Sequence, residues 1–127
     1  MSFLSARIKS FANAARGIGF LVATQPHAWI HAVATVGVIA GGFALGISRD
    51  EWCLIMLAIG AVWCAEAVNT AIEQLCDKVS PERDPLIGRA KDLAAGAVLL
   101  MAIACAVVGL IVFGPRVLTL IRTLGIG

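Results

Sequence analysis

The sequence predicts an all-α membrane protein in which an N-terminal amphipathic helix lies on the membrane surface and three helices cross the bilayer. Of the 127 residues, 60% are apolar and only 14% are charged, whereas soluble domains contain about 45–50% apolar and about 25% charged residues. A soluble chain of this length could not bury so much apolar surface, and a disordered chain would be far more polar. The length allows a single domain, residues 1–127.

Residues 3–25 are expected to form the surface helix. Apolar side chains recur there at helical spacing and cations interrupt them, a pattern typical of an amphipathic helix at a membrane interface. The apolar positions are Phe3, Leu4, Ile8, Phe11, Ala15 and Ile18, and the cations are Arg7, Lys9 and Arg16. A plain membrane anchor without a catalytic part is the alternative interpretation of this segment.

The first two spans follow from an uncharged run and a helix start signal. Pro26 ends the surface helix, and the first span, about 28–47, carries no formal charge over 20 residues. About 20 residues cross a hydrocarbon core of about 30 Å. Ser48 and Glu51 then have the spacing of a capping box, so the second span is expected over about 51–79.

A polar loop between Pro81 and Pro85 separates the second span from the third, which is expected over about 86–113. Gly114 and Pro115 are expected to end the third span, because proline lacks the backbone donor that a helix needs. Residues 116–127 are then expected to form a short surface helix.

The distribution of Lys and Arg predicts the orientation in the membrane. Seven of the ten cations lie in the N-terminal segment and the 78–91 loop, at positions 7, 9, 16, 78, 83, 89 and 91, and three lie on the other side, at positions 49, 116 and 122. Because cytoplasmic loops carry the excess of cations, the N-terminus and the 78–91 loop are expected to be cytoplasmic.

The second span carries a row of polar residues. Glu66, Asn69, Glu73 and Asp77 fall within about 80° of arc at 100° per residue, so they share one helix face. Glu66 lies about 22 Å beyond Glu51 at 1.5 Å per residue, which leaves it inside a core of about 30 Å. A carboxylate inside the bilayer costs about 2.5–3.5 kcal/mol, so this face must meet other helices or a wet pocket instead of lipid.

The residue types in this row suit phosphoryl transfer. A desolvated Glu66 suits a general base that acts on a hydroxyl at membrane depth, and the wetter Glu73 and Asp77 suit a hard cation such as Mg²⁺. Lys91, across the loop, is a point cation suited to phosphate, and Asp92 is a further acid. These are the groups that phosphoryl transfer uses.

Other interpretations remain at this point. The row could be a structural polar seam between helices, or Glu66 could line a proton or cation channel. Arg89, Lys91 and Asp92 could be an ordinary charged flank of the last span. The net charge of +2 is too small to indicate a nucleic-acid partner.

Three segments resemble the small bacterial integral-membrane diacylglycerol kinase and undecaprenol kinase family over roughly residues 8–113. EAVNTAIEQLCD at 66–77 has the pattern E-x-x-N-[ST]-x-x-E-x-x-x-D, VSPERDPLIGRAKDLAAGAVLL at 79–100 contains the AKD that opens the last helix, and SFANAARGI at 10–18 is similar to the surface helix. The resemblance implies a homotrimeric bundle in the bacterial inner membrane. This bundle would transfer the γ-phosphate of MgATP to the hydroxyl of a membrane lipid, in sites shared between subunits.

Matched by motif, the resemblance assigns roles to the residues of the row and its neighbours. It implies that Glu66 is the general base, that Glu73 and the residue at position 25 bind the metal, and that the remaining matched residues bind substrate or nucleotide: Asn69, Asp77, Lys91, Asp92 and Arg16.

The chain departs from the family pattern at Gln25, where the family usually has a second metal-binding glutamate. An amide oxygen can bind Mg²⁺ but lacks the charge. A catalytically impaired trimeric scaffold or lipid-binding homologue is therefore the alternative function, and His27 or His31 is a candidate to compensate, although both are expected to be interfacial residues. The SPE-x-x-P loop and Ala95 resemble the undecaprenol branch more than the diacylglycerol branch, which favours undecaprenol as the substrate.

Overall fold

The computed structural model describes residues 3–80, 82 and 84–125, and within these residues the chain is helical. The described helices are α1 (Phe3–Thr24), α2 (Pro26–Leu45), α3 (Arg49–Val79) and α4 (Pro85–Thr123). Helices α2, α3 and α4 are each long and apolar enough to cross a membrane. The expectation of three spanning helices is therefore confirmed, and the chain is an α-helical membrane protein.

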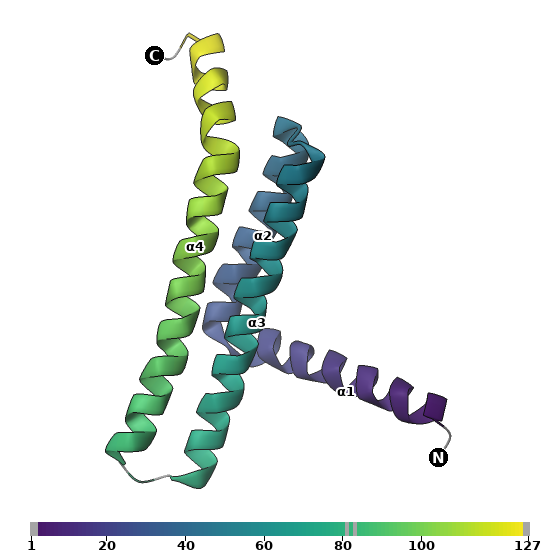
Figure 1. Cartoon of the computed structure of the whole chain (residues 1–127), viewed down its shortest axis with the longest axis vertical. Helices are drawn as coiled ribbons and strands as arrows, with labels where there is room; N and C mark the ends of the chain where they lie inside the picture. Colours follow the sequence, from purple (N-terminus) through teal and green to yellow (C-terminus); the bar gives the residue numbers. More distant parts are fainter. Residues whose placement is uncertain (1–2, 81, 83, 126–127) are drawn as a thin grey trace.

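The three spanning helices alternate in direction, and α1 projects from one end of them at a steep angle (Figure 1). The connection between α3 and α4 lies at the same end as α1 (Figure 1). The N-terminal segment and the connection between α3 and α4 thus share one end of the molecule, and the predicted orientation likewise places them on the same side. Two residues of that loop, Pro81 and Arg83, lie outside the described residues.

The break between α1 and α2 occurs where the sequence predicts it. Gln25 is extended, with φ −100° and ψ 117°, and Pro26 begins α2, a position at which its missing N–H costs nothing. Near this break Leu21 and Ala28 are buried, while the apolar side chains farther out on α1, including Phe3, Ile8 and Phe11, are exposed.

Helix α3 begins with the capping box that the sequence predicts. Ser48 Oγ accepts a hydrogen bond from the Glu51 backbone, and the Ser48 backbone donates to Glu51. Both oxygens of Glu51 also bind Arg116 of α4, at 2.6 and 2.7 Å. Ile55 and Val112 pack in the apolar cluster beside them. These five residues, Ser48, Glu51, Ile55, Val112 and Arg116, are called the closed end below.

The prediction that Gly114 and Pro115 end the last helix is wrong. Helix α4 continues through Pro115 to Thr123, so residues 116–123 prolong the third span instead of forming a separate surface helix. Proline is tolerated in membrane helices where neighbouring groups hold the local backbone. Here the Arg116 guanidinium donates to the Val112 carbonyl as well as to Glu51, which joins the turn that contains the proline to the first turn of α3.

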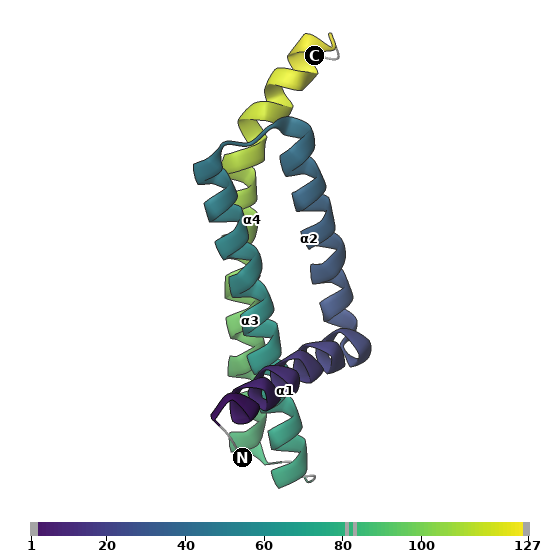
Figure 2. The ribbon, with the colours of Figure 1, turned by 90° about the vertical axis from the view of Figure 1, so that its right-hand side faces the viewer.

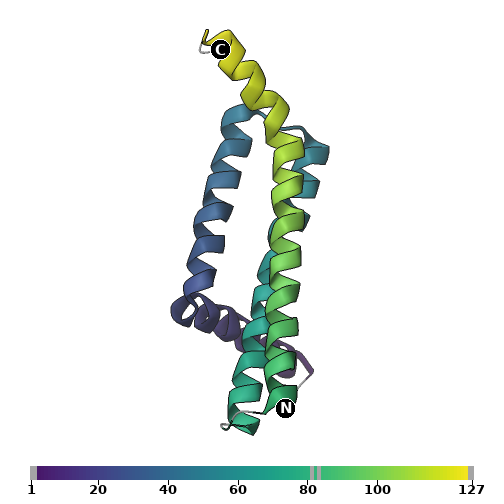
Figure 3. The same ribbon diagram turned by 90° about the vertical axis from the view of Figure 1, so that its left-hand side faces the viewer.

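Helix α3 packs most extensively along α4, and α2 makes fewer contacts with either of them. Figures 2 and 3, from opposite sides, show α2 standing apart from the α3 and α4 pair along much of its length. A polar contact joins α2 to α3 near mid-length, where Trp63 Nε1 donates to Thr35 Oγ1 at 3.1 Å. The face of α3 that carries the polar row therefore lies among α1, α2 and α4.

Candidate functional site

The polar row of α3 becomes more exposed from the middle of the helix toward the loop. Glu66 and Asn69 are buried, with 2% and 9% of their surfaces exposed. Glu73 is half-buried and Asp77 is exposed. Thr70, beside the row, is buried as well. The exposure of the row therefore increases along α3 from Glu66 to Asp77, toward the connection with α4.

Glu66 faces another helix, as expected from the free energy that a carboxylate facing lipid would cost. Its Oε2 lies 3.7 Å from Nε2 of His31 on α2, and the exposed fractions of the two side chains are 3% for Glu66 and 15% for His31. This neighbour was not predicted, because His31 lies near the start of a span and was expected to be an interfacial residue. The structure instead places its imidazole against the buried carboxylate.

Asn69 and Glu73 offer oxygen atoms one helical turn apart. Asn69 Nδ2 donates to Glu73 Oε1 at 3.4 Å, which leaves Asn69 Oδ1 buried without a hydrogen-bond partner. Buried polar atoms are normally paired, so an unpaired amide oxygen beside a carboxylate fits a ligand. Carboxylate and amide oxygens are the donors that hard cations such as Mg²⁺ prefer.

Asp77 and Lys91 meet across the connection between α3 and α4. Lys91 Nζ donates to Asp77 Oδ1 at 2.8 Å, and both side chains are at least one third exposed. The pair places an ammonium group at the end of the molecule where the loop and α1 lie. Asp92, the next residue, points elsewhere: it is exposed and lines a shallow hollow along α4 with Arg89 and Leu93.

Arg16 and Gln25 have contacts close to their own positions in the chain. The Arg16 guanidinium donates to the Asn13 side chain on the same helix, and Gln25 Nε2 donates to Thr24 Oγ1 at 3.5 Å. Among residues 3–80, 82 and 84–125, the structure holds no group of three or more His, Cys, Asp or Glu side chains suited to a metal. One chain thus groups Glu66 with His31, Asn69 with Glu73, and Asp77 with Lys91.

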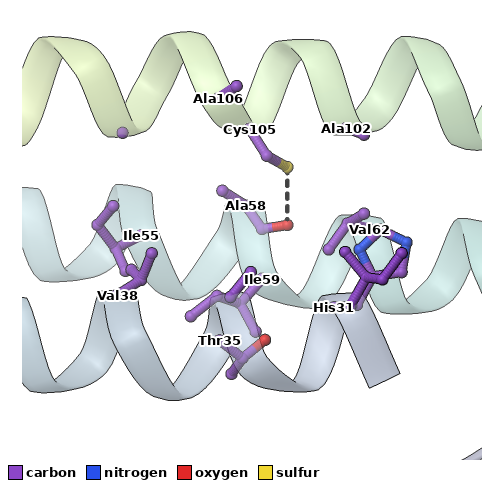
Figure 4. A pocket seen from close by; sticks show the side chains of 13 residues that line it. His31, Thr35, Val38, Ile55, Ala58, Ile59, Val62, Ala102, Cys105 and Ala106 are labelled. Carbon is purple, nitrogen blue, oxygen red and sulfur yellow. Dashed lines mark hydrogen bonds between the residues drawn. The ribbon is translucent and has the colours of Figure 1, made fainter. Parts of the chain in front are cut away.

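An apolar cavity of about 320 Å³ lies between α2, α3 and α4. Its walls include Val38, Ile55 and Ile59, and His31 is at one end of it (Figure 4). On the α4 side, Cys105 Sγ donates to the Ala58 carbonyl at 3.1 Å (Figure 4). A second hollow, of about 290 Å³, lies between α1 and α3 and is lined by Thr70.

Comparisons with known proteins identify relatives of nearly the whole chain. The profile of the prokaryotic diacylglycerol kinases matches residues 12–113. The chain is 40% identical to an undecaprenol kinase of Bacillus subtilis over 108 residues. The matched region covers 85% of this chain and 88% of that protein. The chain is 37% identical to a diacylglycerol kinase of Synechocystis over 112 residues, a region that covers 87% of this chain and 64% of that protein. A diacylglycerol kinase of Pseudomonas aeruginosa is 36% identical over 81 residues, 62% of this chain and 66% of that protein.

Proposed function

The chain belongs to the prokaryotic diacylglycerol kinase family and is therefore a lipid kinase, and we propose that it transfers the γ-phosphate of ATP to the hydroxyl of undecaprenol. The similarity to an undecaprenol kinase, which extends over most of both chains, supports the choice of lipid. The diacylglycerol kinases match at somewhat lower identity and over about two thirds of their own length.

The observation that carries the proposal is a carboxylate buried on α3 where it meets α2. In the proposed reaction the lipid hydroxyl oxygen bonds to the γ-phosphorus while the bond from that phosphorus to the β–γ bridging oxygen breaks, and ADP leaves. Glu66 accepts the hydroxyl proton as general base. Its position at mid-helix, with 2% of its surface exposed, supports this role, because the hydroxyl of a membrane lipid must meet its base close to the bilayer.

The neighbouring residues supply groups for nucleotide and metal. Glu73 and the unpaired Asn69 Oδ1 would hold Mg²⁺, with the amide oxygen of Gln25 as a further ligand, and the ion when bound neutralises charge on the phosphates. The other matched residues would bind nucleotide or substrate: Asp77, Lys91, Asp92 and Arg16. Lys91, near the start of α4, suits a phosphate group as a point charge.

We further propose that the protein acts as a homotrimer in the bacterial inner membrane, with α1 and the 78–91 loop in the cytoplasm. The excess of cations at this end supports the orientation. The trimer is supported by the resemblance and by the contacts of Asp92 and Arg16: Asp92 lines the hollow along α4, and Arg16 bonds Asn13 of its own helix. Sites shared between copies would bring such residues to one reaction centre.

The test is lipid phosphorylation by purified protein in mixed micelles with ATP and Mg²⁺. Glu66→Gln should lower kcat by about 10²–10⁴-fold, the contribution of a positioned general base. Glu51→Gln, a carboxylate of the same helix at the closed end, is the matched control and should keep kcat within about twofold. Retention of full activity by Glu66→Gln would show that Glu66 is not the base.

The same assay tests the lipid. We expect kcat/KM for undecaprenol to exceed that for diacylglycerol by about tenfold or more, within the range that an apolar pocket can discriminate. The reverse ratio would make the protein a diacylglycerol kinase, and transfer to neither lipid would overturn the choice of substrate.

A further inference from the structure

His31 occupies a position between the apolar cavity and the buried carboxylate of Glu66. Its Nε2 lies 3.7 Å from Glu66 Oε2, and only 15% of its side chain is exposed. The same imidazole forms one end of the cavity between α2, α3 and α4 (Figure 4). A half-buried imidazole beside a buried carboxylate is a poor choice for packing alone, because both groups lose much of their contact with water.

The imidazole is held in place from a second side. The rings of His31 and Trp63 meet edge to face, with centroids 6.3 Å apart and planes inclined by 61°. Trp63 is fixed in turn, because its Nε1 donates to Thr35 Oγ1 at 3.1 Å. Thr35 lies four residues beyond His31 on α2, so it stands on the same face one helical turn away.

These contacts form a continuous series that crosses between α2 and α3: Thr35 to Trp63, Trp63 to His31, and His31 to Glu66. Helix α2 otherwise makes fewer contacts than α3 and α4 make with each other. The series therefore holds the His31 ring in its orientation toward Glu66. His31 and Thr35 are one helical turn apart on α2, and Trp63 and Glu66 are one turn apart on α3.

We propose, on the premise of the proposed function, that His31 is a positioning residue for Glu66. Its Nε2–H donates to Glu66 Oε2, which fixes the carboxylate and leaves Oε1 to accept the hydroxyl proton. The separation of 3.7 Å exceeds a hydrogen bond by about 0.7 Å, and catalytic hydrogen bonds commonly tighten only when substrate is bound. The role belongs to α2, outside the polar row.

The experiment compares His31→Ala with His31→Gln in the micelle assay. Loss of the positioning contact should lower kcat of His31→Ala by about 10–100-fold, because small misplacements of a catalytic group have effects of this size. The KM values for ATP and lipid should stay within about twofold, since ground-state binding is unchanged. Gln can present an amide N–H near the position of Nε2, so His31→Gln should recover at least about one third of the wild-type kcat. Val36→Ala, at an exposed position of the same helix, is the matched control and should behave as wild type.

Imidazole added to the buffer gives a second readout that a packing role would not produce. It should raise the kcat of His31→Ala several-fold by entering the space that the side chain leaves, and it should not affect Glu66→Gln. Full activity of His31→Ala, or failure of both glutamine and imidazole to restore it, would overturn the positioning role. An active Glu66→Gln in the same experiment would instead overturn the proposed base, so the two failures are distinguishable.

Discussion

Glu51 and Glu66 lie on the same helix, 15 residues apart, and have very different surroundings. Glu51 at the closed end accepts two hydrogen bonds from Arg116, at 2.6 and 2.7 Å, and a third from the Ser48 backbone at 2.7 Å. Glu66 contacts His31 at 3.7 Å, and near it Asn69 Oδ1 and Thr70 Oγ1 are buried without hydrogen-bond partners. The protein pairs its polar atoms at the closed end of α3 and leaves two of them open in the middle of the helix, beside Glu66.

This difference separates a structural use of polar residues from a functional one. The bonds of Glu51 join α3 to α4 and are complete within one chain, so its carboxylate is not available to a ligand. The open groups near Glu66 have a cost, since an unsatisfied buried polar group destabilises a fold by about 1–3 kcal/mol. Such groups are expected where a ligand, a metal or a second copy supplies the missing partner.

After the loss of activity expected for Glu66→Gln, the largest effect that separates the two regions is expected at the proposed metal site. Glu73→Gln keeps the shape of the side chain but removes its charge, so we expect about 100-fold lower activity at limiting Mg²⁺ and partial recovery as Mg²⁺ is raised. Activity measured as a function of Mg²⁺ concentration checks this. The matched Glu51→Gln variant should have the wild-type Mg²⁺ dependence and a lower thermal midpoint, because Arg116 loses a charged partner. Identical Mg²⁺ dependence of Glu73→Gln and wild type would contradict a metal site in the polar row.

A smaller effect, on stability alone, is expected at Gly42 of α2, which lies against residues of the apolar cluster beside the closed end. A Cβ at Gly42 would lie 2.7 Å from Trp52 Cη2 and 3.1 Å from Ile47 Cδ1, so the half-buried ring of Trp52 must shift. Gly42→Ala should therefore lower the free energy of unfolding by about 1–3 kcal/mol while the kcat of the folded enzyme stays unchanged. Unfolding in denaturant checks the first part. Gly37→Ala, on the same helix, is the control and should be neutral or slightly stabilising, because a Cβ added at Gly37 would meet open space. A loss of stability as large as that of Gly42→Ala would mean that the close contact with Trp52 is not the cause.

The sequence predicts much of this comparison because its strongest signals are local. Uncharged runs mark the spans, Pro26 marks the start of α2, and Ser48 with Glu51 marks the start of α3, each within one stretch of chain. The burial of Glu66 also follows, since the cost of a carboxylate in lipid holds whatever its neighbour is. What the sequence could not supply is register between helices.

Two features depended on that register. His31 meets Glu66 only because α2 and α3 run antiparallel with those turns aligned, and nothing in either segment alone fixes this alignment. Helix α4 continues past Pro115, and Arg116 there bonds Glu51 of the neighbouring helix α3; local helix-breaking propensity takes no account of such a contact and gave the wrong end. The roles of all the site residues remain predictions, and for Arg16, Gln25 and Asp92 the contacts within one chain are local or on the outer surface.

The smallest effect tests whether an open group near Glu66 is idle. Thr70 lines the hollow between α1 and α3, and its hydroxyl has no partner. Thr70→Val replaces that hydroxyl with a methyl group of similar size, so stability should be unchanged or up to about 1 kcal/mol higher, while kcat/KM for the lipid should fall about 2–10-fold if the hydroxyl bonds substrate. Thr35→Val is the opposite case: it leaves the Trp63 N–H without its acceptor and should destabilise the fold by about 1–3 kcal/mol. Denaturant unfolding and lipid kinetics on both variants check this. If Thr70→Val destabilises the protein as much as Thr35→Val does, the Thr70 hydroxyl is part of the structural framework. The polar groups left open for a ligand would then not include Thr70.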